Sequence, residues 1–161
     1  RGGLTWAIDD ATAAIRLDRG DADAYAIRSA AAMKSGDFRQ ALADACEAVR
    51  LRPNDPLLLS NRGALYESLG DLSRALADYD QAVRLKPDSW AARHNRASAA
   101  IKMAKQSPPA GSPASTATTV QSAYWHQALA DLDEAARLKP GDLGTSRQRA
   151  SVFKQLAGPD R

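Results

Sequence analysis

The chain has 161 residues, of which 44% are hydrophobic and 25% charged, enough for one ordinary globular domain. Lysine and arginine exceed aspartate and glutamate by 22 to 19, and the interspersed charges give no strong nucleic-acid signal. No apolar run approaches the ~20 residues of a membrane span, and the only cysteine is Cys46, which excludes an internal disulfide. We therefore expect a cytoplasmic location, with a nuclear or cytoskeletal assembly left open.

Eight helices are predicted, because apolar residues fall at helical spacing and alanine-rich segments have high helix propensity. In chain order they cover residues 4–18, 22–35, 37–51, 55–69, 71–85, 89–104, 122–138 and 142–157. Gly36 and Gly70 lie just before two of them, where a turn needs a residue that tolerates positive φ. Residues 104–122 are rich in Pro, Ser, Thr, Ala and Gly, and we expect a low-complexity insertion there. It is either a tolerated loop or a docking or phosphorylation segment, because Ser107 and Ser112 each precede a proline.

One stretch of sequence occurs three times and ends each time in proline: ALADACEAVRLRP (41–53), ALADYDQAVRLKP (75–87) and ALADLDEAARLKP (128–140). The first two copies set the period, from Pro53 to Pro87, and the insertion lengthens the next interval, to Pro140. Small residues recur at two fixed places, which are Ala41, Ala75 and Ala128, then Ala48, Ala82 and Ala135. A fixed period of this size indicates a stacked helical repeat.

The segment 59–87, LSNRGALYESLGDLSRALADYDQAVRLKP, resembles the tetratricopeptide repeat (TPR) at almost every signature place. The resemblance implies an all-α fold, a right-handed superhelical array of antiparallel helix pairs. We expect a single TPR domain over residues 1–161, with a partial repeat 1–21, repeats 22–55, 56–89 and 90–142, and a capping helix 142–157. Repeat 22–55 departs from the family pattern, because Ser29, Ala32 and Ala45 replace a glycine and two aromatic residues. The chain begins on a second-type helix and without methionine, so we expect a piece of a longer protein.

In this family the first helix of each repeat lines a concave groove. Asn61 and Asn95 occupy equivalent places there, and a side-chain amide can bracket a peptide group because it both donates and accepts. The alternative is that each asparagine bonds within its own repeat. The candidate peptide-binding residues are Asn61, Asn95, His94, Lys102, Arg147, Gln148 and Lys154. The basic members favour an acidic partner segment, although a solvated polar face is equally compatible with them.

The chaperone-adaptor branch of the family holds a C-terminal carboxylate with cationic and amide side chains. Only Asn61 fits that pattern, because Ala26, Ala30 and Ala91 stand where clamp residues would be. A heat-shock chaperone tail is therefore not the expected ligand.

Charged residues also recur at constant spacing. Each aspartate precedes an arginine by the same interval, in the pairs Asp10 and Arg28, Asp44 and Arg62, Asp78 and Arg96, and Asp131 and Arg149. We predict that these pairs join the second helix of one repeat to the first helix of the next. A row of arginines is otherwise typical of nucleic-acid binding.

No catalytic, metal or cofactor site is predicted. His94 and His126 are isolated from other metal ligands, Cys46 lacks a recognisable base, and no phosphate-binding glycine loop occurs. Trp90 is the best candidate for an aromatic contact outside the core. The sequence therefore predicts a non-catalytic scaffold that binds an extended peptide or a helix of a partner protein. The alternatives are a structural subunit of a large assembly and, with less support, a helical-repeat RNA binder.

Overall fold

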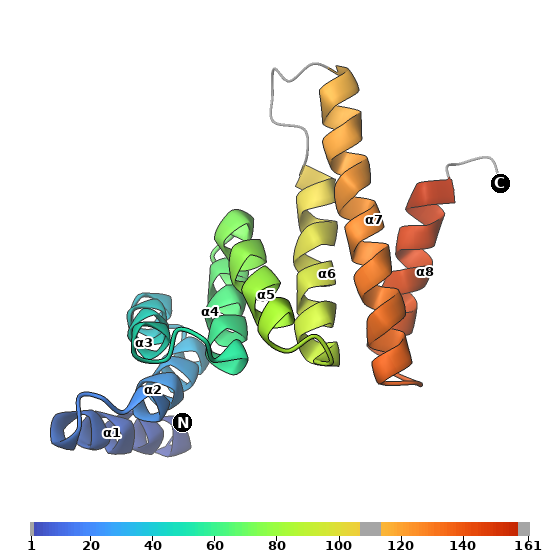
Figure 1. The fold of residues 1–161 in the computed structure, drawn as a ribbon. Helices are drawn as coiled ribbons and strands as arrows, with labels where there is room; N and C mark the ends of the chain where they lie inside the picture. The colour runs from blue at the N-terminus through green and yellow to red at the C-terminus, as the bar shows by residue number, and fades with distance from the viewer. Residues whose placement is uncertain (1, 107–113, 158–161) are drawn as a thin grey trace. The chain divides into compact units, whose positions relative to one another are not determined.

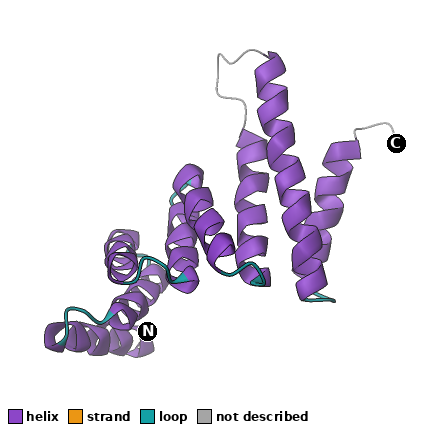
Figure 2. Ribbon diagram, viewed as in Figure 1, coloured by secondary structure: helices purple, strands orange, loops and turns teal. Residues whose placement is uncertain are grey.

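The computed structural model describes residues 2–106 and 114–157, and within them the chain forms eight α-helices and no strand (Figure 2). The helices are α1 (Gly2–Leu17), α2 (Ala22–Ser35), α3 (Phe38–Leu51), α4 (Pro56–Ser68), α5 (Leu72–Leu85), α6 (Trp90–Gln106), α7 (Ala114–Leu138) and α8 (Leu143–Ala157). The predicted all-α class is confirmed. Across the described ranges, no helix is both long and apolar enough to cross a membrane.

The chain divides into two compact units, residues 1–85 with helices α1 to α5 and residues 86–161 with helices α6 to α8. In the first unit α2 pairs with α3 and α4 with α5, and in the second unit α6 pairs with α7 (Figure 1). Each pair consists of consecutive helices joined by a short turn or by the insertion, so each is an antiparallel helical hairpin. The prediction of a single domain over residues 1–161 stays a prediction.

Aspartate side chains begin most of the helices. Asp21, Asp37 and Asp55 each accept a hydrogen bond from backbone N–H groups of the first turn that have no partner within the helix. Gly36 and Gly70 end α2 and α4 with φ of 87° and 82°, which confirms the predicted left-handed turns. These local signals set the hairpin boundaries that the sequence analysis gave to within a few residues.

The two recurring alanine positions lie at the centre of the helix contacts. Ala41, Ala75 and Ala128 are completely buried, and Ala48, Ala82 and Ala135 are at most 1% exposed. A larger side chain at these places would push the paired helices apart, because protein interiors are close-packed. The repeat pattern therefore encodes the close approach of helices within and between hairpins.

A second set of contacts balances small residues of the first helix against large residues of the second. A Cβ atom at Gly63 would lie 2.9 Å from the ring of Tyr79, which is 1% exposed. The equivalent places hold Ala97 and Leu132 in the third repeat, and Ser29 and Ala45 in the repeat 22–55. In the repeat 22–55 both residues are small, and they line a pocket.

The structure corrects the prediction for residues 104–122. Helix α6 continues to Gln106 and α7 begins at Ala114, well before the predicted start at residue 122. Residues 107–113, including Ser107 and Ser112, lie outside the described part of the chain. The helical stretch from Ala114 is polar but contains no proline or glycine, and extending a packed helix avoids the unfavourable nucleation step.

Candidate functional site

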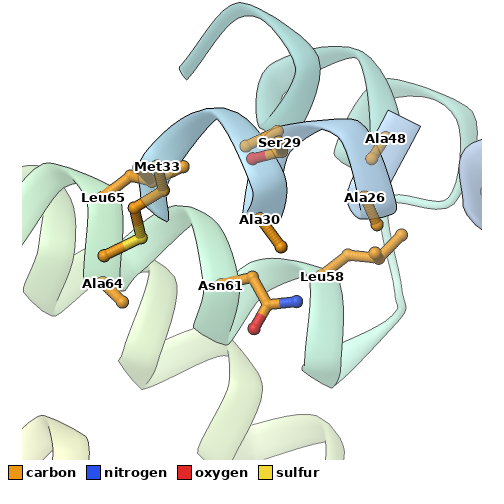
Figure 3. A pocket seen from close by; sticks show the side chains of 10 residues that line it. Ala26, Ser29, Ala30, Met33, Ala48, Leu58, Asn61, Ala64 and Leu65 are labelled. Carbon is orange, nitrogen blue, oxygen red and sulfur yellow. The ribbon is translucent and has the colours of Figure 1, made fainter. Parts of the chain in front are cut away.

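The first unit contains a pocket between the first helices of two successive repeats, α2 and α4. Its volume is about 120 Å³, and α3 forms its base. Two of the side chains that line it are polar, those of Ser29 and Asn61. The others are apolar: Ala26, Ala30, Met33, Ala45, Ala48, Leu58, Ala64 and Leu65. Figure 3 shows Leu58 opposite Ala26, Asn61 next to Ala30, and Met33 beside Ala64 and Leu65.

The pocket exists because the repeat 22–55 departs from the repeat pattern. Ala45 stands where the next two repeats place the large residues Tyr79 and Leu132, so the base of the pocket is left unfilled. Ala26 and Ala30 likewise leave the wall from α2 shallow. The hydroxyl of Ser29 donates to the carbonyl of Ala41 at 2.8 Å, so its hydrogen is already used.

Asn61 lies at the pocket with an exposed side chain. Within the part of the chain that the structure describes, its amide makes no hydrogen bond to another residue. The alternative that Asn61 bonds inside its own repeat therefore has no support in the structure. A polar group with both donor and acceptor capacity is therefore held on α4, with its amide between Ala30 and Leu58 (Figure 3).

Two large apolar side chains that adjoin pocket residues in the sequence are exposed. Ile27 on α2 is 54% exposed and Leu57 on α4 is 65% exposed, and each lies within one turn of a pocket residue. Exposed apolar residues gathered around a pocket are typical of protein-interaction surfaces. Neither Met33 nor Leu58 was among the candidate residues predicted from the sequence, although both line the pocket.

The recurring arginines and aspartates pair within a repeat, so the prediction of pairing between repeats is wrong. Arg28 binds Asp44 through two hydrogen bonds of 2.8 and 2.7 Å, and Arg62 binds Asp78 with the same two distances. In the second unit Arg96 binds Asp131 at 2.7 and 2.5 Å. Each pair therefore joins the first helix of a repeat to the second helix of the same repeat.

These pairs are structural, because the carboxylates are nearly buried and the arginine stems are mostly covered. The hydrogen bonds that Arg28 donates to Asp44 raise the pKa of Arg28, and those that Arg62 donates to Asp78 raise the pKa of Arg62. Two-point binding to a carboxylate occupies the guanidinium face that would otherwise receive a phosphate. Arg149 departs from the series, because it lies 3.5 Å from the exposed carboxylate of Asp133. The row of arginines therefore gives no support to nucleic-acid binding.

His94 in the second unit is half-buried and already engaged. Its Nδ1 lies 3.1 Å from the Thr145 hydroxyl, and that hydroxyl donates to Asp142 at 2.8 Å. Nδ1 must therefore carry the hydrogen and donate it to Thr145. This chain of bonds ties α6 to the start of α8, and it lowers the pKa of Asp142, which accepts from the backbone and the hydroxyl of Thr145.

Trp90, at the start of α6, contacts two neighbours within the second unit. The Lys139 ammonium lies 3.7 Å from the centre of the indole, and the His94 ring meets it edge-on at 6.1 Å. A cation over an aromatic face is attracted by the electron density of the ring. The indole is only half-buried, so the expectation of an aromatic contact with a partner stays a prediction.

The remaining predicted residues lie on α6 and α8. Asn95 is half-buried, and among the described residues its amide also lacks a partner. Gln148 has a buried Oε1 atom that receives no hydrogen bond from the described residues. Lys102, Arg147 and Lys154 are exposed. Asn61 belongs to the first unit and the other six residues to the second, so a continuous site across all seven stays a prediction.

Comparisons with known proteins agree with this architecture. A family model described as tetratricopeptide repeat matches residues 29–106. Among curated proteins, no sequence matches the chain.

Solved structures share the fold at low sequence identity. The first TPR of Spaghetti (RPAP3), bound to the HSP90 peptide SRMEEVD, is 19% identical with a TM-score of 0.70, covering 84% of this chain and 93% of that one. MamA is 12% identical with a TM-score of 0.78, over 97% and 80% of the two chains. The Arabidopsis OM64 TPR domain is 18% identical with a TM-score of 0.66, over 81% and 93%.

Tetratricopeptide repeats serve in general as scaffolds for protein–protein interaction and are generally non-catalytic. The matched family model, the repeated alanine positions and the helical hairpins together identify this chain as a protein that contains tetratricopeptide repeats.

Proposed function

We propose that this chain is a non-catalytic scaffold that binds a segment of a partner protein on the face formed by the first helices of its repeats. The observation that carries the proposal is the Asn61 amide. It is exposed beside an apolar pocket and, among the described residues, has no hydrogen-bond partner. A peptide group placed over Asn61 would find a donor and an acceptor on one rigid side chain.

The second unit supports the same interpretation through Gln148, which holds the place of Asn61 in a later repeat. A buried acceptor without a donor costs free energy, typically about 1–3 kcal/mol. If the Gln148 side chain turned outward on binding, a backbone N–H of the bound segment would supply the donor that Oε1 lacks in the described part of the chain. Asn95 and Gln148 would then act in the second unit as Asn61 does in the first.

The HSP90 peptide belongs to the Spaghetti structure, and we propose a different ligand for this chain. Ala26 and Ala30 line the pocket at the places where the clamp pattern needs cationic and amide side chains. A carboxylate placed there would be desolvated without a charged partner. We propose a preference for an acidic partner segment only in the second unit, where Lys102, Arg147 and Lys154 are exposed. We also propose a cytoplasmic location.

The test is selection from a random peptide library displayed on phage, with the intact chain as bait. We expect enriched peptides whose affinity falls about 5- to 150-fold in Asn61→Ala, because two hydrogen bonds are lost at about 0.5–1.5 kcal/mol each. The matched control is Asn54→Ala, an exposed asparagine in the turn before α4. Peptides that bind Asn61→Ala as tightly as the original chain would contradict the proposed site.

The two other candidate functions give different results in the same experiment. A structural subunit would enrich no peptide. An RNA binder would retain single-stranded oligonucleotides with an affinity that falls steeply as salt rises.

A further inference from the structure

The pocket between α2 and α4 is more specific than a general peptide groove. We infer that it receives one uncharged aliphatic side chain of the partner, of the size of leucine, isoleucine or methionine, while Asn61 holds the adjoining peptide group. This inference rests on the proposed function, because it names the kind of residue that the partner must present to the first unit.

The charge of the pocket selects a neutral side chain. Apart from Asn61, its only polar group is the Ser29 hydroxyl, whose hydrogen is bonded to the Ala41 carbonyl. The guanidinium of Arg28, on the same helix, is held by both oxygens of Asp44. An ammonium or carboxylate entering the pocket would therefore be desolvated without compensation. A neutral, apolar lining is complementary only to a neutral, apolar group.

The volume of the pocket selects among apolar side chains. An apolar protein cavity of about 150 Å³ holds a six-carbon benzene ring. The pocket measures about 120 Å³, which suits the three heavy atoms beyond Cβ of a leucine, isoleucine or methionine side chain. The ring and methylene of phenylalanine exceed it, and an indole exceeds it further. Met33 lines one wall, and the flexible methionine side chain adapts to branched and unbranched occupants.

The surroundings extend the apolar contact beyond the pocket. Leu57 on α4 precedes the pocket residue Leu58 and is exposed, whereas the exposed Ile27 on α2 lines a separate pocket with residues of α1. A segment with a second apolar residue near its anchor would cover Leu57. The expected partner segment is therefore a short run with an aliphatic anchor and no charge at that position.

The first experiment tests the pocket without a peptide. The probe is N-acetyl-leucine N-methylamide, titrated into the intact chain while methyl signals of Met33, Leu58 and Leu65 are followed by NMR. We expect saturable shifts of these methyl groups with a millimolar midpoint. The aspartate and lysine versions of the same amide should leave them unshifted. Unshifted methyl signals with the leucine amide, or equal shifts with the charged amides, would overturn the inference.

A pocket-filling variant supplies the second arm. Ala30→Leu places a larger side chain at the pocket, and Ala43→Leu makes the same change at an exposed alanine of α3 that does not line it. Both variants should keep the thermal midpoint and helix content of the original chain, because both positions are exposed. We expect Ala30→Leu to abolish the shifts caused by the leucine amide, and Ala43→Leu to retain them. Retention of the shifts in Ala30→Leu would contradict the inference.

Peptides from the library selection connect the two claims. Truncating the anchor of an enriched peptide from leucine to alanine should weaken binding about 50-fold, because each buried methylene changes affinity about fourfold. If enriched peptides depend on Asn61 but tolerate Ala30→Leu, the pocket inference fails and the scaffold stands. If the leucine amide binds but no peptide is enriched, the proposed function fails and the pocket stands.

Discussion

Replacing Arg62 and Asp78 singly and together tests whether each repeat is closed by its own charge pair. The Asp78 side chain is 7% exposed and that of Arg62 is 22% exposed, and two hydrogen bonds of 2.8 and 2.7 Å join them. Loss of Arg62 leaves a carboxylate buried without its partner, for which about 3–5 kcal/mol is typical. Loss of Asp78 leaves a guanidinium that is partly open to water, so we expect a smaller cost of about 1–2 kcal/mol.

The double variant removes both charges and should cost less than the sum of the single losses. We expect a coupling energy of about 1.5–3 kcal/mol between Arg62→Met and Asp78→Ala. Methionine keeps most of the apolar stem of the arginine, so the cycle reports the charge pair rather than lost packing. The assay is urea unfolding followed by far-UV circular dichroism, accepted only where the four variants share one m-value.

The control cycle uses Arg62 with Asp44, the partner that constant spacing alone favoured. No hydrogen bond joins these two side chains, because Asp44 is held by Arg28. We expect their coupling to be several-fold smaller than that between Arg62 and Asp78. Additive losses in the Arg62–Asp78 cycle, or equal coupling in both cycles, would refute this account of the repeat.

Three further changes test other contacts. Gly63→Ala should lower the free energy of unfolding, measured with urea, by about 1–2 kcal/mol, because the new methyl group would lie 2.9 Å from the Tyr79 ring. Adding Tyr79→Leu reproduces the Ala97 and Leu132 pair of the third repeat and should restore most of the lost stability. The pKa of Asp142 is lowered in the folded chain, so the stability that its carboxylate contributes is complete above the ordinary aspartate pKa near 3.9 and is lost as pH falls through the lower folded pKa. In an acid titration followed by the amide signals of α8, Asp142→Asn should remove this loss of stability. An unchanged acid midpoint would count against the bond to Thr145. Lys139→Met should alter the intrinsic fluorescence, to which Trp90 contributes, and should lower the free energy of unfolding by no more than about 1 kcal/mol, because the ammonium lies over a half-buried indole. An unchanged spectrum would show that the contact is absent in solution.

The helices and their order were predictable because every level of the sequence pattern agrees. Alanine-rich periodicity, aspartate at helix starts and glycine at helix ends all indicate the same hairpins. The partner of each arginine was not predictable from spacing. Asp44 precedes Arg62 and Asp78 follows it, and the spacing from each aspartate to the arginine recurs elsewhere in the chain. Either aspartate was therefore compatible with the sequence.

The insertion made pairing between repeats look more regular in the sequence than pairing within a repeat. It separates Arg96 from Asp131 by 35 residues, while the spacing between repeats stays constant. In space it changes little, because α6 and α7 are lengthened beyond the pair and their facing surfaces keep the same register. Sequence separation within a hairpin therefore says little about contact across it.

The pocket was visible in the sequence only as a departure from a family pattern. Ala45 was recognised as replacing an aromatic residue, yet a lost ring can equally be compensated by a larger neighbour. The structure shows that Ser29 does not compensate and that Ala48 and Leu58 line the remaining space. The exposure of Asn61 followed from its register, whereas its lack of a partner among the described residues required side-chain positions.

The most direct test of the central claim is chemical-shift mapping of the intact chain with a peptide from the library selection. If the first helices of the repeats form the binding face, the largest shifts within the first unit will fall on Ala30, Asn61 and their neighbours on α2 and α4. Shifts confined to exposed positions of the second helices, such as Ala43 on α3 and Ala77 on α5, would contradict it.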